Sequence, residues 1–313
     1  MSSCFRAGSS TTLTRFLELL RGLGDDAEIA LEATYGWEWL ADLLEEAGYD
    51  LHLSHPLRTK AIAAARVKTD AVDARTLAHL LRADLLPEAY IAPRELRDLR
   101  DLLRHRVALT RMRSALKHRV AAVLAKNGVQ PAYGDLFGPG GRRFLAELPL
   151  REPPRRRLDS LLALIDAFDG EIEQTSREID ARASEDPYVE VLCQIRGVGR
   201  YIAMLVIAEV GDITRFASAR HLCAWAGLTP TVRSSDRRTR LGHISGQGSP
   251  ALRWAWHHGC ERARMRALAL AQRPAAHTPS PPHPSVKRKR SSALVLCQWP
   301  LLADHATDGR PLD

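Results

Sequence analysis

Residues 26–53 read DAEIALEATYGWEWLADLLEEAGYDLHL, and this stretch decides the fold class. Residues 26–32 predict a strand that enters a turn, and residues 49–53 predict a second strand. Between them, residues 37–47 predict a helix closed by Gly48. Alternation of strand and helix is typical of parallel strand pairing, so this part of the chain is predicted to be an α/β unit.

The sequence outside this unit predicts mainly helices. A basic helix over residues 93–127 has leucines and valines at roughly heptad spacing, which favours an antiparallel coiled coil or a helical bundle. A second long helix, over residues 156–184, is a possible partner, and the Gly- and Pro-rich residues 130–155 predict a loop with a short helix. Shorter helices are predicted at residues 13–24 and 70–84.

A change of composition near residue 188 indicates a separate, mainly helical C-terminal domain. It starts with IRGVGR at residues 195–200, the pattern of a helix-hairpin-helix. Glycine there allows backbone amides to approach a phosphate, although the same turn is also a plain packing motif. Prolines recur from residue 274 to the end without helical periodicity, so residues 274–313 are predicted to be mostly disordered.

The charge of the chain points to a polyanionic partner. The net charge is +8 over 313 residues, and residues 94–126 hold ten basic side chains against three acidic ones. Residues 196–273 are also rich in arginine. One such run fits a solvated helix face, but two separate runs favour nucleic acid.

The cysteines and the apolar runs indicate the cellular compartment. The five cysteines are scattered without a CxxC pair, which argues against a zinc site or a disulfide framework and favours a reducing cytoplasm. We find no signal peptide and no apolar run long enough to span a bilayer. The sequence therefore predicts a cytoplasmic protein without a membrane partner.

Three acidic residues are candidates for a metal site. Glu32 ends the first predicted strand, and Asp70 and Asp73 share one face of the helix that follows. Carboxylates held close together favour a hard cation such as Mg²⁺, as in phosphoryl transfer. The same spacing also fits a plain helix start, with Asp70 as the N-cap and Asp73 in the first turn.

A second candidate site is RSSDRRTRLGHISGQGS at residues 233–249. A serine among arginines can attack a phosphodiester, because guanidinium groups stabilise the charge that develops on the phosphate oxygens. The alternative is a phosphate-binding loop without a covalent role.

Several segments in order resemble the DEDD transposases of the insertion-sequence-110 class. Residues 31–36, 55–60 and 68–74 resemble that family's RuvC-like (RNase H-like) domain. Residues 197–199, 216–230, 235–248 and 252–253 resemble its C-terminal transposase domain. The resemblance covers roughly residues 13–273. It implies a partial RuvC-like domain at residues 1–90, a coiled-coil region at 91–187, a transposase domain at 188–273 and a tail at 274–313.

The resemblance also implies roles for residues. Glu32, Asp70 and Asp73 match the last three acids of the DEDD set, and so imply Mg²⁺ ligands. Ser235 matches the nucleophile that forms a phosphoserine link to DNA, with Ser234, Ser245 and Ser249 as the other candidates. This chain has Asp236 where the family usually has glycine after the serine.

The family resemblance implies a recombinase that acts as a homo-oligomer on donor and target DNA, guided by a structured RNA. The nucleic-acid contacts that we expect are Lys60, Lys68, Arg104, Arg111, Lys117, Gly197, Gly199, Arg237, Arg238, Arg240 and Arg253.

Two departures from the family pattern favour alternative functions beside that of an active transposase. The family's first acidic strand is not found upstream of Glu32, so the RuvC-like domain is expected to be truncated, and residues 274–313 resemble out-of-frame translation. The alternatives are therefore a catalytically impaired remnant that binds nucleic acid, or a related DNA invertase or Holliday-junction nuclease.

Overall fold

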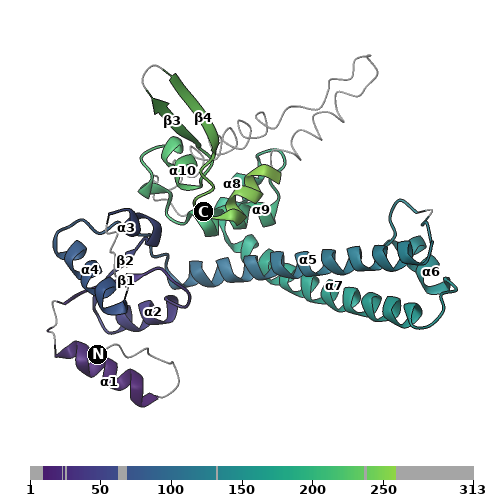
Figure 1. The fold of residues 1–313 in the computed structure, drawn as a ribbon, viewed down its shortest axis with the longest axis horizontal. Coiled ribbons are helices and arrows are strands. Elements are labelled where there is room, and N and C mark those ends of the chain that lie inside the picture. The colour runs from purple at the N-terminus through teal and green to yellow at the C-terminus, as the bar shows by residue number, and fades with distance from the viewer. Residues whose placement is uncertain are drawn as a thin grey trace. The chain divides into compact units, whose positions relative to one another are not determined.

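The computed structural model describes residues 10–22, 24, 27–62, 69–131, 133–235 and 238–258. The chain forms two compact units, Met1–Arg94 and Glu95–Asp313. The first is α/β, and the second combines helices with one β-hairpin (Figure 1). In the part of the chain that the structure describes, no helix is both long enough and apolar enough to cross a membrane.

The first unit confirms the predicted strand–helix–strand arrangement. Strands β1 (Glu28–Glu32) and β2 (Asp50–Ser54) pair in parallel, with Glu28 opposite Asp50 and Glu32 opposite Ser54. Helix α2 (Glu38–Glu46) connects them. The other helices of this unit are α1 (Ser10–Arg21), α3 (Pro56–Ile62), which was not predicted, and α4 (Asp70–Arg82).

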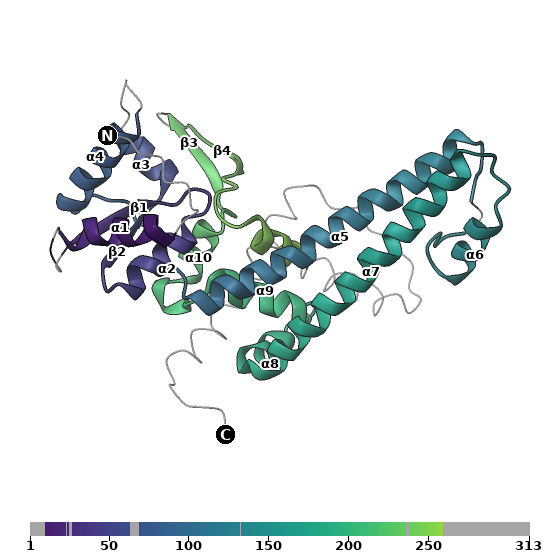
Figure 2. The same ribbon diagram turned by 90° about the horizontal axis from the view of Figure 1, so that it is seen from below.

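Side-chain alternation divides the two strands into an apolar and a polar face. Leu51 and Leu53 lie on the apolar face, and Leu53 is buried. Helix α2 lies against β2 and helix α4 lies against β1. Figure 2 shows α4 and α2 on opposite sides of the strands. The polar face keeps Glu28, Asp50 and His52 on one side of the sheet.

A histidine on β2 is tied to the segment that follows α4. The backbone of residues 87–89 runs beside β2, where the amide of Ala89 donates to the carbonyl of Leu53 at 2.6 Å. His52 Nδ1 lies 2.6 Å from Glu88 Oε1. This hydrogen bond raises the pKa of His52 above its ordinary value of 6.5; burial opposes the shift, and the nearby negative charges of Glu88, Asp50 and Glu28 support it.

The second unit is built on two long antiparallel helices, as predicted. Helices α5 (Arg94–Lys126) and α7 (Pro154–Glu185) are 33 and 32 residues long, so each spans about 50 Å at 1.5 Å per residue. At one end α6 (Pro139–Glu147) covers a small core around Leu124 and Leu158.

The other end of the helical pair carries the main core of this unit. It contains α8 (Pro187–Cys193), α9 (Arg200–Val210), η1 (Ile213–Arg215), α10 (Ala219–Trp225) and a helix over residues 250–258. Helix α9 is apolar almost all round and is therefore buried. Leu103 of α5 and Ile179 of α7 belong to the same core. Helices from both sides of residue 188 thus share one core.

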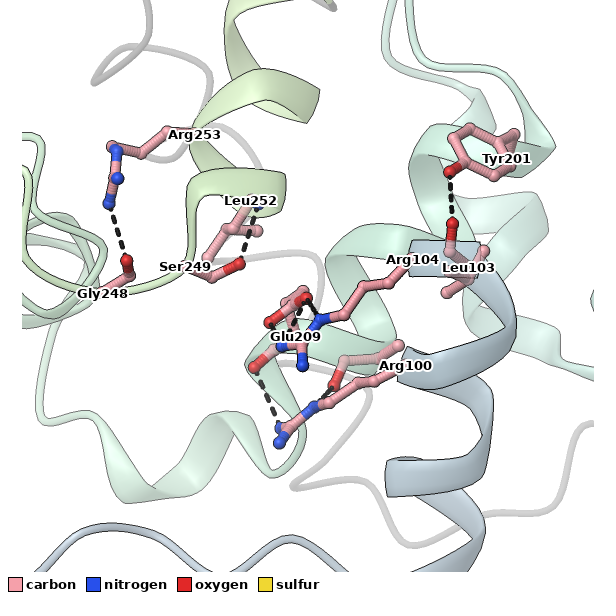
Figure 3. Close-up of polar contacts among 10 residues, drawn as sticks. Arg100, Leu103, Arg104, Tyr201, Glu209, Gly248, Ser249, Leu252 and Arg253 are labelled. Atoms are coloured by element: carbon pink, nitrogen blue, oxygen red, sulfur yellow. Dashed lines mark hydrogen bonds and ion pairs between the residues drawn. The ribbon is translucent and has the colours of Figure 1, made fainter. Parts of the chain in front are cut away.

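A buried carboxylate joins α5 to α9 (Figure 3). The Glu209 side chain is only 3% exposed, whereas that of Arg104 is 51% exposed. Arg104 donates from Nε and Nη2 to the two carboxylate oxygens, at 3.0 Å each. One turn earlier, Arg100 donates to the carbonyls of Ala208 and Glu209 at 2.6 and 3.2 Å. These contacts satisfy carbonyls that the end of α9 leaves without helical partners.

A β-hairpin that the sequence did not predict contains most of the second candidate site. Strands β3 (Pro230–Ser235) and β4 (Arg238–Ile244) pair in antiparallel register. The sequence did not predict them because β3 is exposed on both faces, and a strand without a buried face shows no apolar alternation.

The His52–Glu88 pair predicts a pH dependence of stability. Protonated His52 favours the folded state, because its folded pKa is raised above 6.5. This contribution is complete below pH 6.5 and is lost as pH rises through the raised pKa. Between pH 6 and 8, the free energy of unfolding measured in urea should fall by about 0.5 kcal/mol more in the wild type than in Glu88→Gln. This value is small because solvent screens the partly exposed pair. Parallel pH profiles for the two proteins would contradict the assignment.

The Arg104–Glu209 pair predicts an asymmetric response to mutation. Arg104→Met leaves a buried carboxylate without its counter-ion and should lower the free energy of unfolding by about 2–3 kcal/mol, near the lower limit for broken buried pairs. Glu209→Gln should cost less, because the remaining Arg104 is half exposed and can be hydrated. Urea denaturation followed by tryptophan fluorescence measures both, since Trp256 and Trp225 belong to the core around α9. Arg111→Met, at an exposed position of the same helix, is the control. An equal loss of unfolding free energy in this variant would contradict the role of the Arg104–Glu209 pair.

Candidate functional site

The three predicted metal ligands lie on β1 and α4. Glu32 is the last residue of β1 and is exposed. Asp70 and Asp73 lie in the first turn of α4, where Asp70 is exposed and Asp73 is half-buried. The N-cap is Thr69, whose hydroxyl accepts a hydrogen bond from the Val72 amide at 3.3 Å. The alternative prediction of Asp70 as N-cap is therefore wrong, and its carboxylate is not occupied by capping.

The chemistry of these three residues fits Mg²⁺, which prefers oxygen ligands. Among the residues described, the side chains of Glu32, Asp70 and Asp73 make no ion pair. However, they do not form a group whose donor atoms lie within 4.8 Å of one another; over the described residues that group is Glu28, Asp50 and His52.

The Glu28–Asp50–His52 group lies at the amino ends of the strands rather than at the carboxyl end where Glu32 lies. Its histidine nitrogen Nδ1 is already bonded to Glu88, and Nε2 lies 3.7 Å from Asp50 Oδ2. The Nδ1 contact holds the His52 ring in place, whereas Nε2 is buried and has no hydrogen-bond partner among the described residues.

The hairpin places the two adjacent serines on opposite faces. In the paired register, Arg233 is opposite Arg240, and Val232 is opposite Leu241. Because side chains alternate along a strand, Ser235 shares a face with Arg233, and Ser234 shares the other face with Val232. Arg233 was not among the predicted contacts, because the sequence did not show that this segment is a strand.

The other two candidate serines lie at the base of the hairpin. Ser249 precedes the helix at residues 250–258, and its hydroxyl accepts a hydrogen bond from the Leu252 amide at 3.2 Å (Figure 3). Ser249 therefore acts as a helix cap. Ser245 is exposed, and its backbone amide donates to the carbonyl of Thr229 at 3.0 Å.

The base of the hairpin is held by an arginine and two glycines. Arg253 Nη1 donates to the carbonyls of Ala226, Gln247 and Gly248 at 3.2, 3.2 and 2.9 Å. Gly227 has φ +73°, and a Cβ there would meet the Gln247 carbonyl at 1.9 Å. Gly248 has φ +93°, and a Cβ there would lie 2.3 Å from a backbone oxygen. The loops that carry β3 and β4 thus require these residues.

The remaining predicted nucleic-acid contacts have different surroundings. Arg104 is paired with Glu209, and Lys117 Nζ lies 4.7 Å above the Phe137 ring. Arg111 on α5 and Lys60 on α3 are exposed. Arg240 and Arg238 lie on β4, whereas Lys68 and Arg237 lie outside the described residues.

The predicted helix-hairpin-helix is formed by α8, a turn and α9. Gly197 has φ +90° in that turn, a conformation that favours glycine. Gly199 is the N-cap of α9 and offers no side chain to its first amides. Phosphate binding at this turn stays a prediction.

Charge is distributed unevenly between the two long helices. The inward Arg113 of α5 is paired with Asp169 of α7, and Arg106 donates to Ser176 at 2.7 Å. Along its outward face α5 has exposed basic side chains that make no ion pair with described residues: His105, Arg111, His118, Arg119 and Lys126. The second unit therefore has a basic stripe along α5, which we define by these five residues.

Two family models match the chain in the order of its motifs. A transposase model of the DEDD insertion-sequence-110 type matches residues 5–127. A second model, described as the transposase IS116/IS110/IS902 family, matches residues 189–276.

Curated relatives agree with these matches. A probable family 20 transposase of Pseudomonas aeruginosa is 28% identical over 251 residues, covering 77% of this chain and 72% of that protein. The transposase for insertion sequence element IS1111A of Coxiella burnetii is 32% identical over 181 residues, covering 55% of this chain and 48% of that protein. An IS116 protein of Streptomyces clavuligerus is 29% identical, over 42% of this chain and 30% of its own length. With both of its folded parts matched in order, the chain belongs to the IS116/IS110/IS902 family of insertion-sequence transposases.

Proposed function

We propose that this chain cleaves and rejoins DNA through Ser235. Its hydroxyl oxygen attacks a phosphodiester phosphorus, an Oγ–P bond forms, and the bond to one deoxyribose oxygen breaks. The serine proton leaves to solvent, and the released deoxyribose oxygen takes up a proton. Attack by a deoxyribose hydroxyl of another strand reverses the step and frees the serine. The observation that carries this proposal is the shared face of Ser235 and the opposed pair Arg233–Arg240.

The two arginines supply the electrostatic part of this reaction. Guanidinium groups near the attacked phosphate stabilise the negative charge that grows on its oxygens. Among the described side chains, Ser234 shares its face with Val232 and Leu241 and not with Arg233 and Arg240. We therefore favour Ser235 over Ser234 as the nucleophile.

The acids of the first unit complete the proposal. Glu32, Asp70 and Asp73 would hold Mg²⁺ within a RuvC-like domain. When bound, the ion would act as a Lewis acid on a phosphoryl oxygen. The parallel strands β1 and β2, with Glu32 at a carboxyl end and α4 against β1, support this assignment.

Nucleic acid is the partner that the basic stripe favours, because its side chains have no counter-ions among the described residues. From the family we further propose a structured guide RNA, a homo-oligomer and a bacterial cytoplasmic setting. We expect Arg104 to contribute less to binding than Arg111, because Glu209 already balances its charge.

A second candidate is a remnant that binds nucleic acid without cleaving it. It is favoured by one observation: Glu32, Asp70 and Asp73 do not gather into a close group within the described part of the chain.

A covalent adduct decides between the two candidates. Wild-type protein with cognate RNA, Mg²⁺ and a nicked suicide DNA substrate should yield a protein–DNA adduct on denaturing gels. Ser235→Ala should lose at least about 100-fold of the adduct, which corresponds to about 3 kcal/mol of the barrier. Ser234→Ala is the matched control and should keep the adduct. An adduct that survives Ser235→Ala but not Ser245→Ala would move the nucleophile, and DNA binding by wild type without any adduct would select the remnant.

The basic stripe predicts a salt dependence of binding. Each phosphate contact contributes about one unit to the slope of log K against log salt. Replacing Arg111, Arg119 and Lys126 with glutamine should therefore reduce the slope by about three, measured by fluorescence anisotropy over a salt series. Arg177→Gln on α7 is the control, since that arginine is already 3.5 Å from Glu173. An unchanged slope in the triple variant would show that the basic stripe does not contact the phosphates.

A further inference from the structure

A histidine and two carboxylates converge near the amino ends of β1 and β2. Glu28 and Asp50 are directly opposite each other in the parallel pair, and His52 follows Asp50 by two residues on the same face. Each residue offers one donor atom, and these atoms lie within 4.8 Å of one another. Ala30 is opposite His52 and has only a methyl group, so no large side chain of β1 stands opposite the ring.

The contacts within this group are incomplete. Carboxylates in opposed positions destabilise a strand pair, because their charges repel. His52 Nε2 lies 3.7 Å from Asp50 Oδ2, which is longer than the roughly 2.7–3.2 Å of a hydrogen bond. Nε2 is also buried and has no hydrogen-bond partner among the described residues. A buried polar atom without a partner is rare in folded proteins, and it indicates a ligand at this position.

The separation of the donor atoms suits a metal ion. Zinc binds histidine nitrogen and carboxylate oxygen at about 2.0–2.2 Å. Two such ligands on a tetrahedral ion lie about 3.4 Å apart, close to the 3.7 Å between His52 Nε2 and Asp50 Oδ2. The Glu28 side chain is long and exposed, so its carboxylate is free to close on the same ion.

Glu88 sets the form of the histidine that a metal requires. Its Oε1 atom lies 2.6 Å from His52 Nδ1, and an ionised carboxylate only accepts hydrogen bonds, so Nδ1 carries the proton. In the neutral ring the lone pair is then on Nε2, the nitrogen on the side of Asp50. An outer carboxylate that orients a histidine in this way also raises the basicity of the nitrogen that binds the metal.

We propose that Glu28, Asp50 and His52 bind one Zn²⁺ ion, which ties β1 to β2. The ion forms bonds to Nε2 and to one oxygen of each carboxylate, and a proton on Nε2 leaves to solvent. Imidazole nitrogen suits zinc, whereas Mg²⁺ prefers oxygen ligands and retains its waters. The site is separate from the three acids of the proposed Mg²⁺ site and does not rest on the proposed function.

Zinc binding to the full chain tests the site directly. Metal-free protein, in which His52 can be protonated, is titrated with Zn²⁺ against a chromogenic chelator in a buffer with excess Mg²⁺. Glu28→Gln/Asp50→Asn should bind one zinc ion fewer per chain than wild type. Both residues are exposed, so this variant should keep the fold. Glu32→Gln/Asp70→Asn removes the same charge from the same unit and should bind zinc as wild type does.

A second variant tests the orienting role of Glu88. Glu88→Gln keeps an oxygen that accepts from His52 Nδ1 but removes the negative charge. It should weaken zinc binding about tenfold and leave the number of bound ions unchanged, since losses of outer carboxylates typically cost 10- to 100-fold in metal affinity. Unchanged affinity in this variant would exclude Glu88 as an orienting residue.

Hydrogen exchange locates the bound ion. Zinc should slow amide exchange in peptides that cover β1 and β2 by about tenfold or more in wild type, and should not do so in Glu28→Gln/Asp50→Asn. Co²⁺ is used in place of Zn²⁺ to identify the ligands. The difference between the Co²⁺ spectra of wild type and this variant should lack thiolate charge-transfer absorption, because no cysteine is among the proposed ligands.

Three outcomes would overturn the inference: equal zinc stoichiometry in wild type and Glu28→Gln/Asp50→Asn, unchanged exchange in β1 and β2 on addition of zinc, or displacement of the zinc by Mg²⁺. The adduct assay is a separate readout, because zinc binding is measured without DNA. Loss of the zinc site leaves the proposed cleavage by Ser235 untouched, and absence of an adduct leaves the zinc site untouched.

Discussion

A carboxylate buried in an apolar core must meet a positive charge, and Glu209 meets Arg104 from the long helix α5. This single requirement fixes α9 against α5 at one angle and depth, since Arg100 on the preceding turn binds the last carbonyls of α9. The rest of the main core follows, because α8, α10 and the helix at residues 250–258 all pack around α9. The loops of the hairpin are in turn held by Arg253 from that last helix.

The same geometry separates the arginines of α5 into those that pair within the fold and those that face solvent. Arg104, Arg106 and Arg113 are occupied by Glu209, Ser176 and Asp169, so their charge supports the fold. Arg111 and Arg119 face solvent on the same helix, where no described side chain balances them. Helix position alone therefore separates structural arginines from those available to a polyanion, and a count of basic residues in the sequence could not make this distinction.

Much of the first unit could be predicted because its signals are local. The run at residues 26–53 has strand and helix periodicities that side-chain burial reproduces, and it led to the correct parallel pair and to Glu32 at the end of β1. The cap of α4 was harder, since Thr69 and Asp70 are both good N-caps and only the backbone shows that Thr69 takes the role. The group of Glu28, Asp50 and His52 depends on the register of two strands, which sequence spacing does not contain.

Periodicity and short motifs were enough to predict the long helices, the parallel strands, the family and the candidate acids and serines, because these signals lie within short stretches of the chain. The hairpin at residues 230–244, and with it the opposite orientation of Ser235 and Ser234, became visible in the folded chain and not before. The physical reason is that a strand exposed on both faces has no apolar alternation to read. Its pairing is set instead by distant contacts at its base, from Gly227, Gly248 and Arg253.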